Sequence, residues 1–159
     1  MPDGRLHDTD FYAWTQEQAA ILRRMASDRI NSELDLRFLA EEIEELGGSD
    51  LRALESDLAR VIEHLLKLRF SPAQDPRRAW RRSVIEHRDR VQATVERSAT
   101  LARKLPDLLP FAWRRARKLA VAGLEDDGVD GAAVPTDCPF TLAEILDDAW
   151  LPEPPTSQS

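Results

Sequence analysis

The chain of 159 residues lacks the features that place a protein outside the cell or across a membrane. Its one cysteine, Cys138, cannot form an intramolecular disulfide and is typical of a reducing compartment. The N-terminal residues contain no apolar run that resembles a signal peptide. No stretch approaches the ~20 apolar residues that a transmembrane helix needs. We therefore expect a cytoplasmic protein of bacterial type that does not enter a membrane.

Motifs for nucleotide binding and nucleophilic catalysis are missing as well. The sequence contains no P-loop, no glycine-rich dinucleotide fingerprint and no Gly-x-Ser-x-Gly nucleophile elbow. Cys138 precedes a proline and has no basic residue near it in the sequence that would lower the pKa of its thiol. We therefore expect no cofactor and assign no catalytic residue.

Two runs of aliphatic residues predict long α-helices. Within each run the residues recur at steps of three and four, which places them on one face of a helix. The runs are Leu36, Leu39, Ile43 and Leu46, then Leu51, Leu54, Leu58, Val61, Leu65 and Leu68. We expect helical structure from near Asp35 to near Phe70. Gly47 and Gly48 separate the runs, and two glycines cost a helix interior about 2 kcal/mol, so a break or sharp kink is expected there.

Capping patterns predict where the first and last helices begin. A threonine followed three residues later by Gln or Glu can satisfy two free backbone N–H groups reciprocally. Thr15 with Gln18 has this pattern and predicts the start of a short first helix; Thr141 with Glu144 predicts a short last helix. The aromatic residues just before the first helix, expected to cover one end of a bundle, are Phe11, Tyr12 and Trp14.

Prolines divide the remaining chain. Pro76 suits the first turn of a helix, so we expect one to begin there. Pro106 and Pro110 lack the backbone donor that a helix interior uses, so the next helix is expected to strengthen only after Leu108. Residues 123–139, with three glycines and two prolines, are expected to form a loop.

Together these patterns predict an all-α protein. The length suits one domain with one core. We expect a single-domain helical bundle over residues 10–151, with about four longer helices and a short C-terminal helix. Residues 1–9 are expected to be a flexible N-terminus and residues 152–159 a disordered tail.

Several segments resemble those of one known family. The residues that carry the resemblance are 10–18, Leu36, 39–47, 64–67, Trp80, Ile85, Arg88, 138–141, Ile145 and Leu146. In this order and spacing they are similar to the uncharacterised bacterial family catalogued as domain of unknown function twenty-nine. The likeness runs from about residue 8 to residue 152 and departs at Leu68, where the family tends to carry an aromatic residue. It implies a compact all-helical domain with Gly47 inside a long helix, and it brings no established activity or catalytic residue.

The net charge of −7 conceals three segments of alternating sign. Residues 1–59 hold 6 Lys and Arg against 14 Asp and Glu (−8), residues 60–118 hold 16 against 6 (+10), and residues 119–159 hold none against 9 (−9). Either oppositely charged helices pack side by side, or the basic segment forms a surface for an anionic partner. The candidates for such a surface are Arg77, Arg78, Arg81, Arg82, Arg88, Arg114, Arg117 and Lys118.

A carboxylate-rich segment in the first leucine run contains Glu41, Glu42, Glu44 and Glu45. Helical geometry places Glu41, Glu44 and Glu45 opposite the leucine face, in solvent. Glu42 lies at the edge of that face, where a half-buried carboxylate needs a partner. Arg88 is the partner that we expect.

His64 and His87 are candidate metal ligands or proton carriers. A chain reversal near residues 71–76 would bring them to similar depth on adjacent helices. Zinc coordination needs further ligands, however, and neither histidine follows an acidic residue three positions earlier, as in the Glu-x-x-His sites of di-metal bundles. A lone histidine on an apolar face is more often a hydrogen-bonded core residue.

Three functional hypotheses follow. The leading one is a non-enzymatic interaction or regulatory module that docks a protein partner or a copy of itself. The second is a nucleic-acid-associated regulator that uses the arginine-rich segment 77–118, which the acidic isoelectric point disfavours. The third is a metal-binding protein or enzyme that uses Glu42, His64 or His87.

Overall fold

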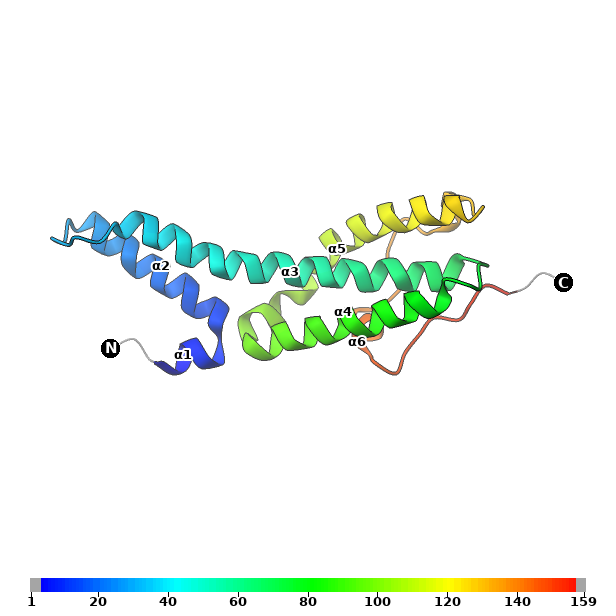
Figure 1. Cartoon of the computed structure of the whole chain (residues 1–159), viewed down its shortest axis with the longest axis horizontal. Coiled ribbons are helices and arrows are strands. Elements are labelled where there is room, and N and C mark those ends of the chain that lie inside the picture. The colour runs from blue at the N-terminus through cyan, green and yellow to red at the C-terminus, as the bar shows by residue number, and fades with distance from the viewer. Residues whose placement is uncertain (1–3, 157–159) are drawn as a thin grey trace. The chain divides into compact units, whose positions relative to one another are not determined.

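A computed structural model describes residues 4–156, and in this range it contains helices and no β-strand. Figure 1 shows the helices in chain order. They are α1 (Gly4–Thr9), α2 (Phe11–Ser27), α3 (Leu36–Phe70), α4 (Arg77–Arg97), α5 (Ala99–Asp126), the 3-10 helix η1 (Gly131–Ala133) and α6 (Leu142–Leu146). The all-α class is confirmed, with four longer helices and a short C-terminal one. No helix among the described residues is both long and apolar enough to cross a membrane.

The helices belong to two compact units, each built from segments that are distant in the sequence. Unit 1 comprises Met1–Leu54 and Ala93–Leu105, and unit 2 comprises Glu55–Gln92 and Pro106–Ser159. Helices α3, α4 and α5 therefore each contribute residues to both units.

In unit 1, α2 lies alongside the first half of α3 (Figure 1). The expected break at Gly47-Gly48 is wrong, because α3 runs through both glycines without interruption. A Cβ atom built on Gly47 would lie 2.2 Å from Oγ1 of Thr15 on α2, closer than real Cβ contacts allow. Gly47 therefore permits the close approach of the two helices and does not end α3.

This continuity also explains which residues in the first half of α3 face inward. In an uninterrupted helix with 100° per residue, Leu36, Ala40, Gly47 and Leu54 fall on one line, and all four are buried. Leu46 lies roughly 80° away from that line, and its side chain is 54% exposed. The expectation that Leu46 faces the core is wrong, because a glycine occupies the inward position next to it.

Helix α2 begins earlier than the threonine pattern indicates. Its N-cap is Asp10, whose carboxylate accepts a hydrogen bond from the backbone N–H of Ala13 at 3.1 Å. Thr15 is fully buried inside the helix and donates its hydroxyl to the Tyr12 carbonyl at 2.7 Å. The capping box expected at Thr15 and Gln18 is therefore wrong, because Asp10, five residues before Thr15, caps the N-terminus of the helix.

Asp10 also joins the beginnings of α2 and α5. Its carboxylate accepts from Oγ of Ser98 at 2.6 Å, and from both N–H and Oγ1 of Thr100 at 3.0 and 2.7 Å. Oγ of Ser98 in turn accepts from the Leu101 N–H, so Ser98 caps the beginning of α5. Burial alone raises the pKa of Asp10, but its hydrogen bonds outweigh burial and hold that pKa below its usual range.

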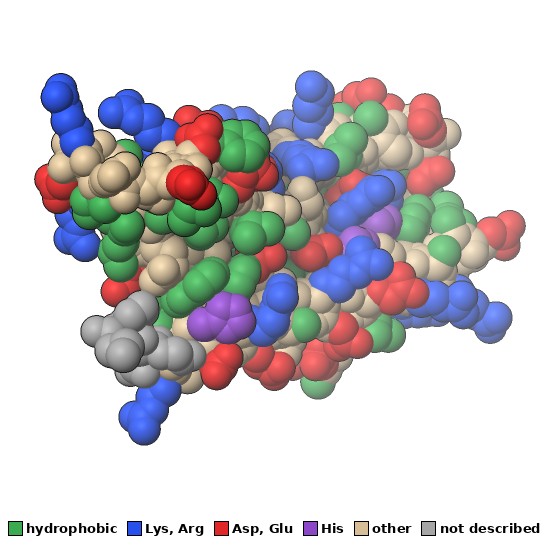
Figure 2. Space-filling view, turned by 60° about the vertical axis from the view of Figure 1, so that its left-hand side comes forward, with side chains coloured by type: hydrophobic (Ala, Val, Ile, Leu, Met, Phe, Trp, Pro, Cys, Tyr) green, Lys and Arg blue, Asp and Glu red, His purple; other side chains and the backbone are tan. Residues whose placement is uncertain are grey.

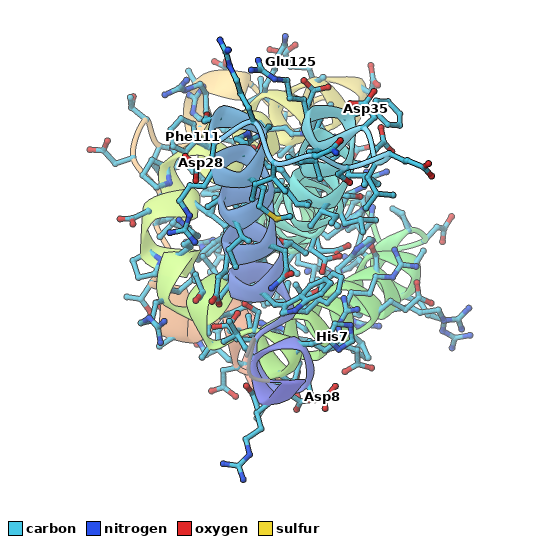
Figure 3. The ribbon with its side chains drawn as sticks, turned by 90° about the vertical axis from the view of Figure 1, so that its left-hand side faces the viewer. His7, Asp8, Asp28, Asp35, Phe111 and Glu125 are labelled. Carbon is cyan, nitrogen blue, oxygen red and sulfur yellow. The ribbon has the colours of Figure 1, made fainter. Side chains whose placement is uncertain are left out.

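The aromatic residues around the start of α2 form a half-exposed cluster with α1. The rings of Phe11 and Trp14 stack with centroids 5.8 Å apart, and His7 meets both edge to face. Figure 3 shows His7 and the neighbouring Asp8 on α1, within the segment expected to be flexible. The cluster fixes α1 against the first turn of α2.

Helix α5 contains both Pro106 and Pro110, so the expected interruption before Leu108 is wrong. Both prolines are exposed, and water can hydrate the carbonyl groups whose helical donors they remove. Leu105, Leu108 and other apolar residues occupy the buried face instead. The helix also continues to Asp126, which shortens the loop expected at 123–139.

The second aliphatic run supplies the core of unit 2. Leu58, Val61 and Leu65 are fully buried, as the pattern predicts, and α4 contributes Val84 and Val91 to the same interior. Small residues dominate the buried face of α5, which presents Ala112, Ala116, Ala120 and Leu124. The capping box at Thr141 and Glu144 is confirmed and starts α6.

We expect Gly47→Ala to destabilise the protein by about 2 kcal/mol, because the buried Thr15 cannot move away from the new methyl group. Gly48→Ala is the matched control. The nearest atom to its Cβ is the end of the flexible Arg52 side chain at 3.3 Å. This substitution should be neutral or stabilise by up to ~1 kcal/mol through helix propensity. Urea unfolding followed by circular dichroism measures both, and equal effects would contradict the close approach.

We expect Asp10→Asn to destabilise the protein by about 2 kcal/mol at pH 7, while the exposed Asp8→Asn has little effect. The pKa of Asp10 is lower in the folded state than in the unfolded state. Its contribution is therefore present above the unfolded value of about 4 and is lost as the pH falls from there through the folded value. Unfolding curves between pH 7 and pH 3 should show the gap between wild type and Asp10→Asn narrowing below about pH 4. A constant gap would refute this role.

Candidate functional site

The eight basic residues predicted to form one surface occupy three different environments. Arg78, Arg81 and Arg82 are exposed on α4. Arg77 and Arg88 are buried on the same helix. Arg114, Arg117 and Lys118 line a groove along α5. The structure thus brings Arg114, Arg117 and Lys118 together, whereas Arg77 and Arg88 are buried and do not contribute to the surface.

Arg77 closes the C-terminal end of α3. Its guanidinium group donates to the carbonyl oxygens of Leu68 at 2.6 Å and Ser71 at 3.0 Å. These carbonyls belong to the end of a helix, where no further backbone N–H reaches them. Burial lowers the pKa of Arg77, and the neighbouring Arg81 lowers it further. The role of Arg77 is to hold the turn between α3 and α4.

Arg88 binds the backbone carbonyls at the C-terminal end of α6. Its Nε and Nη2 donate to the carbonyl oxygens of Ile145 and Glu144 at 2.7 and 3.0 Å. Burial lowers the pKa of Arg88, and the nearby Asp148 and Asp147 partly oppose that shift. The expected pairing with Glu42 is wrong, because Glu42 is exposed and Arg88 is bound to backbone carbonyls.

A groove of about 630 Å³ follows α5, and we call it the α5 groove. Residues of the segment after η1 line its other side and are fastened to the helix. Arg117 donates to the carbonyls of Pro135 and Val134 at 2.8 and 3.1 Å, and Trp113 Nε1 donates to the Thr136 carbonyl at 3.0 Å. The lining residues are Pro110, Trp113, Arg114, Arg117, Lys118, Val121, Thr136 and Asp137.

The two histidines bind different partners in unit 2. His64 Nδ1 lies 3.0 Å from Oγ of Ser83, whereas His87 Nδ1 lies 2.8 Å from Oδ1 of Asp57. The register of α3 against α4 therefore sets Ser83, and not His87, opposite His64. Burial lowers the pKa of His64, which favours its neutral form. Among residues 4–156, no group of three His, Cys, Asp or Glu side chains is arranged to hold a metal ion.

Sequence reasoning missed a buried carboxylate on α3. Glu63 is 3% exposed and accepts hydrogen bonds from Arg60 and Lys67, each at 3.1 Å. Arg60 lies three residues before Glu63 and Lys67 lies four residues after it. This spacing is typical of ion pairs along one helix and could have indicated them from the sequence. Its position within the leucine-rich run indicated burial.

Glu63 borders a second hollow, of about 550 Å³, which we call the polar cleft. Three helices of unit 2 line it. Helix α3 contributes Ser56, Asp57, Ala59, Arg60 and Glu63, α4 contributes His87 and Arg90, and α5 contributes Arg115 and Leu119. Arg90 approaches Asp57 at 3.9 Å, and Arg115 donates to Ser56 Oγ at 3.0 Å. The cleft gathers charged groups of both signs around one hollow.

Cys138 does not have the surroundings of a nucleophile. Its thiol donates to the Phe140 carbonyl at 3.4 Å, and burial raises the pKa of the thiol. A raised pKa disfavours the reactive thiolate at neutral pH. Cys138 therefore packs the segment before α6.

We expect Arg88→Met to destabilise the protein by about 2 kcal/mol, because the buried Ile145 carbonyl and the part-buried Glu144 carbonyl lose a charged donor. Arg78→Met on the exposed side of the same helix should change stability by less than ~0.5 kcal/mol. Thermal and urea unfolding measure both substitutions. Equal effects would show that the bonds to α6 do not hold that helix.

Comparison with known proteins supports the fold and the family. No curated protein matches the chain. The structure is similar to the crystal structure of an alpha-helical protein of unknown function from Rhodospirillum rubrum, with a TM-score of 0.76 and 26% sequence identity. The match covers 91% of this chain and 90% of that one. The model of the family described as "Domain of unknown function DUF29" matches residues 6–151, so the chain belongs to that family.

Proposed function

We propose that this chain is a non-enzymatic protein-interaction module whose α5 groove binds an acidic segment of a partner protein. The observation that carries the proposal is the composition of the groove. Arg114 and Lys118 are exposed cations beside the apolar Pro110, Trp113 and Val121. They outnumber the one carboxylate of the lining, Asp137. A segment that alternates Asp or Glu with a large apolar side chain is complementary to this lining in charge and in polarity.

The groove is held in shape before any partner arrives. Arg117 and Trp113 bind three consecutive carbonyls of the segment 134–136, so the side of the groove opposite α5 is fixed by hydrogen bonds. A preformed groove lowers the entropy that binding costs. Trp113 is half-buried there, and a partly buried indole is a frequent anchor for a protein partner.

The charge distribution favours a protein over a nucleic acid. Acidic and basic side chains are interspersed on the face that Figure 2 shows, and the chain carries a net charge of −7. Arg77 and Arg88, two of the arginines in the 77–118 segment, are occupied inside unit 2. A phosphate backbone requires a run of accessible cations, which this segment supplies less well than its composition suggests.

We place this activity in the bacterial cytoplasm. Cys138 is a free thiol, as is usual in a reducing compartment. The similar structure comes from a bacterium. The proposal needs no metal or cofactor.

The test is the binding of fluorescent peptides that alternate acidic and large apolar residues, measured by anisotropy. The double variant Arg114→Glu/Lys118→Glu should bind the best peptide at least about tenfold more weakly, because two attractive charges become repulsive. The matched control is Arg78→Glu/Arg82→Glu, which makes the same charge change on exposed α4 positions outside the groove. The control should keep its affinity within about twofold.

Three outcomes would contradict the proposal. Equal losses in the two double variants would show non-specific attraction. Tighter binding of a DNA duplex, with a steep loss of affinity as salt rises, would favour the nucleic-acid function. Concentration-dependent light scattering that disappears in Arg114→Glu/Lys118→Glu would identify a second copy of this chain as the occupant of the groove.

A further inference from the structure

The polar cleft carries an inference that does not depend on the α5 groove. We propose that this cleft binds a small phosphate-bearing molecule.

Cations outnumber anions around the cleft. Its lining includes Arg60, Arg90 and Arg115 against the carboxylates Asp57 and Glu63. Glu63 is shared between Arg60 and Lys67, so it cannot neutralise both. The three arginines exceed the two lining carboxylates by one positive charge, and Lys67, which lies outside the lining, also pairs with Glu63. An anionic ligand would balance that surplus.

The cations also present suitable donors. A guanidinium group carries five N–H donors in one plane. The bonds that hold Arg60 to Glu63 and Arg115 to Ser56 use only the Nη1 atom of each arginine. Three guanidinium groups, one on each helix, line the cleft. The three terminal oxygens of a phosphate monoester offer one acceptor atom to each group, whereas two of the groups would have to share one oxygen of a carboxylate, which is why we favour phosphate.

His87 gives the cleft a group that meets the ligand in a defined orientation. Asp57 lies 2.8 Å from Nδ1 of His87, so the carboxylate accepts from that nitrogen and directs the ring. Nε2 is then the ring nitrogen available to a ligand. It donates to a phosphate oxygen when the ring is protonated and accepts from a P–OH group when the ring is neutral.

The size of the cleft indicates more than a bare ion. Its volume of about 550 Å³ falls within the range of small-molecule sites. Ala59 and Leu119 add apolar surface next to the charged groups. This composition suits a phosphate attached to a small organic group, with the phosphate at the arginines.

The experiment titrates the full chain with inorganic phosphate at about 0.15 M salt, which screens general attraction. Isothermal titration calorimetry should give saturable binding with one site per chain. Arg115→Gln and Arg90→Gln should each weaken binding about tenfold, the loss expected for a charge-assisted contact of about 1.4 kcal/mol. Arg82→Gln, an exposed position on the same helix as Arg90, is the control and should leave affinity within about twofold.

A second measurement does not depend on the stability of variants. Imidazole signals in the NMR spectrum of the wild-type protein, assigned with His87→Asn, should shift for His87 on addition of phosphate. His64, which binds Ser83 and does not line the cleft, should not shift. Non-saturable binding, equal losses in Arg82→Gln and Arg115→Gln, an unmoved His87 signal, or tighter binding of succinate than of phosphate would each overturn the proposal.

Discussion

Every helix end leaves backbone N–H or C=O groups without helical partners, and in this protein buried charged side chains close several of those ends. Asp10 supplies acceptors where α2 and α5 begin. Arg77 and Arg88 supply donors where α3 and α6 end. These three side chains therefore fasten the beginnings of α2 and α5 and the ends of α3 and α6.

The same constraint separates structural charges from functional ones. An arginine that donates to buried carbonyls cannot also bind a partner, so Arg77 and Arg88 are committed to the fold. Arg114 and Lys118 on the α5 groove are exposed, and the bonds of Arg60 to Glu63 and of Arg115 to Ser56 in the polar cleft use only the Nη1 atom of each arginine. Both proposed sites lie in unit 2, and both are lined by cations whose neighbours hold them in place.

The family to which the chain belongs is described as a domain of unknown function, so the family gives no activity from which to interpret these surfaces. The crystal structure of the similar Rhodospirillum rubrum protein of unknown function confirms that the helical arrangement is shared. Function must therefore be argued from sites, because a fold alone does not specify one. The α5 groove and the polar cleft are chemically different, and we have proposed an acidic protein segment for the first and a phosphate-bearing molecule for the second.

The sequence by itself determined the all-α class, the second aliphatic run as core, and the capping box at Thr141, since helical periodicity and local capping depend on near neighbours. It also carried the family resemblance. Only the tertiary structure decided the continuity of α3 and α5. Gly47 is accommodated inside α3 because α2 packs closely against it. Pro106 and Pro110 are accommodated inside α5 because their side of the helix faces water. The same packing selected which arginines are buried, since a carbonyl 57 residues away in the sequence, as with Arg88 and Ile145, cannot be read from local pattern.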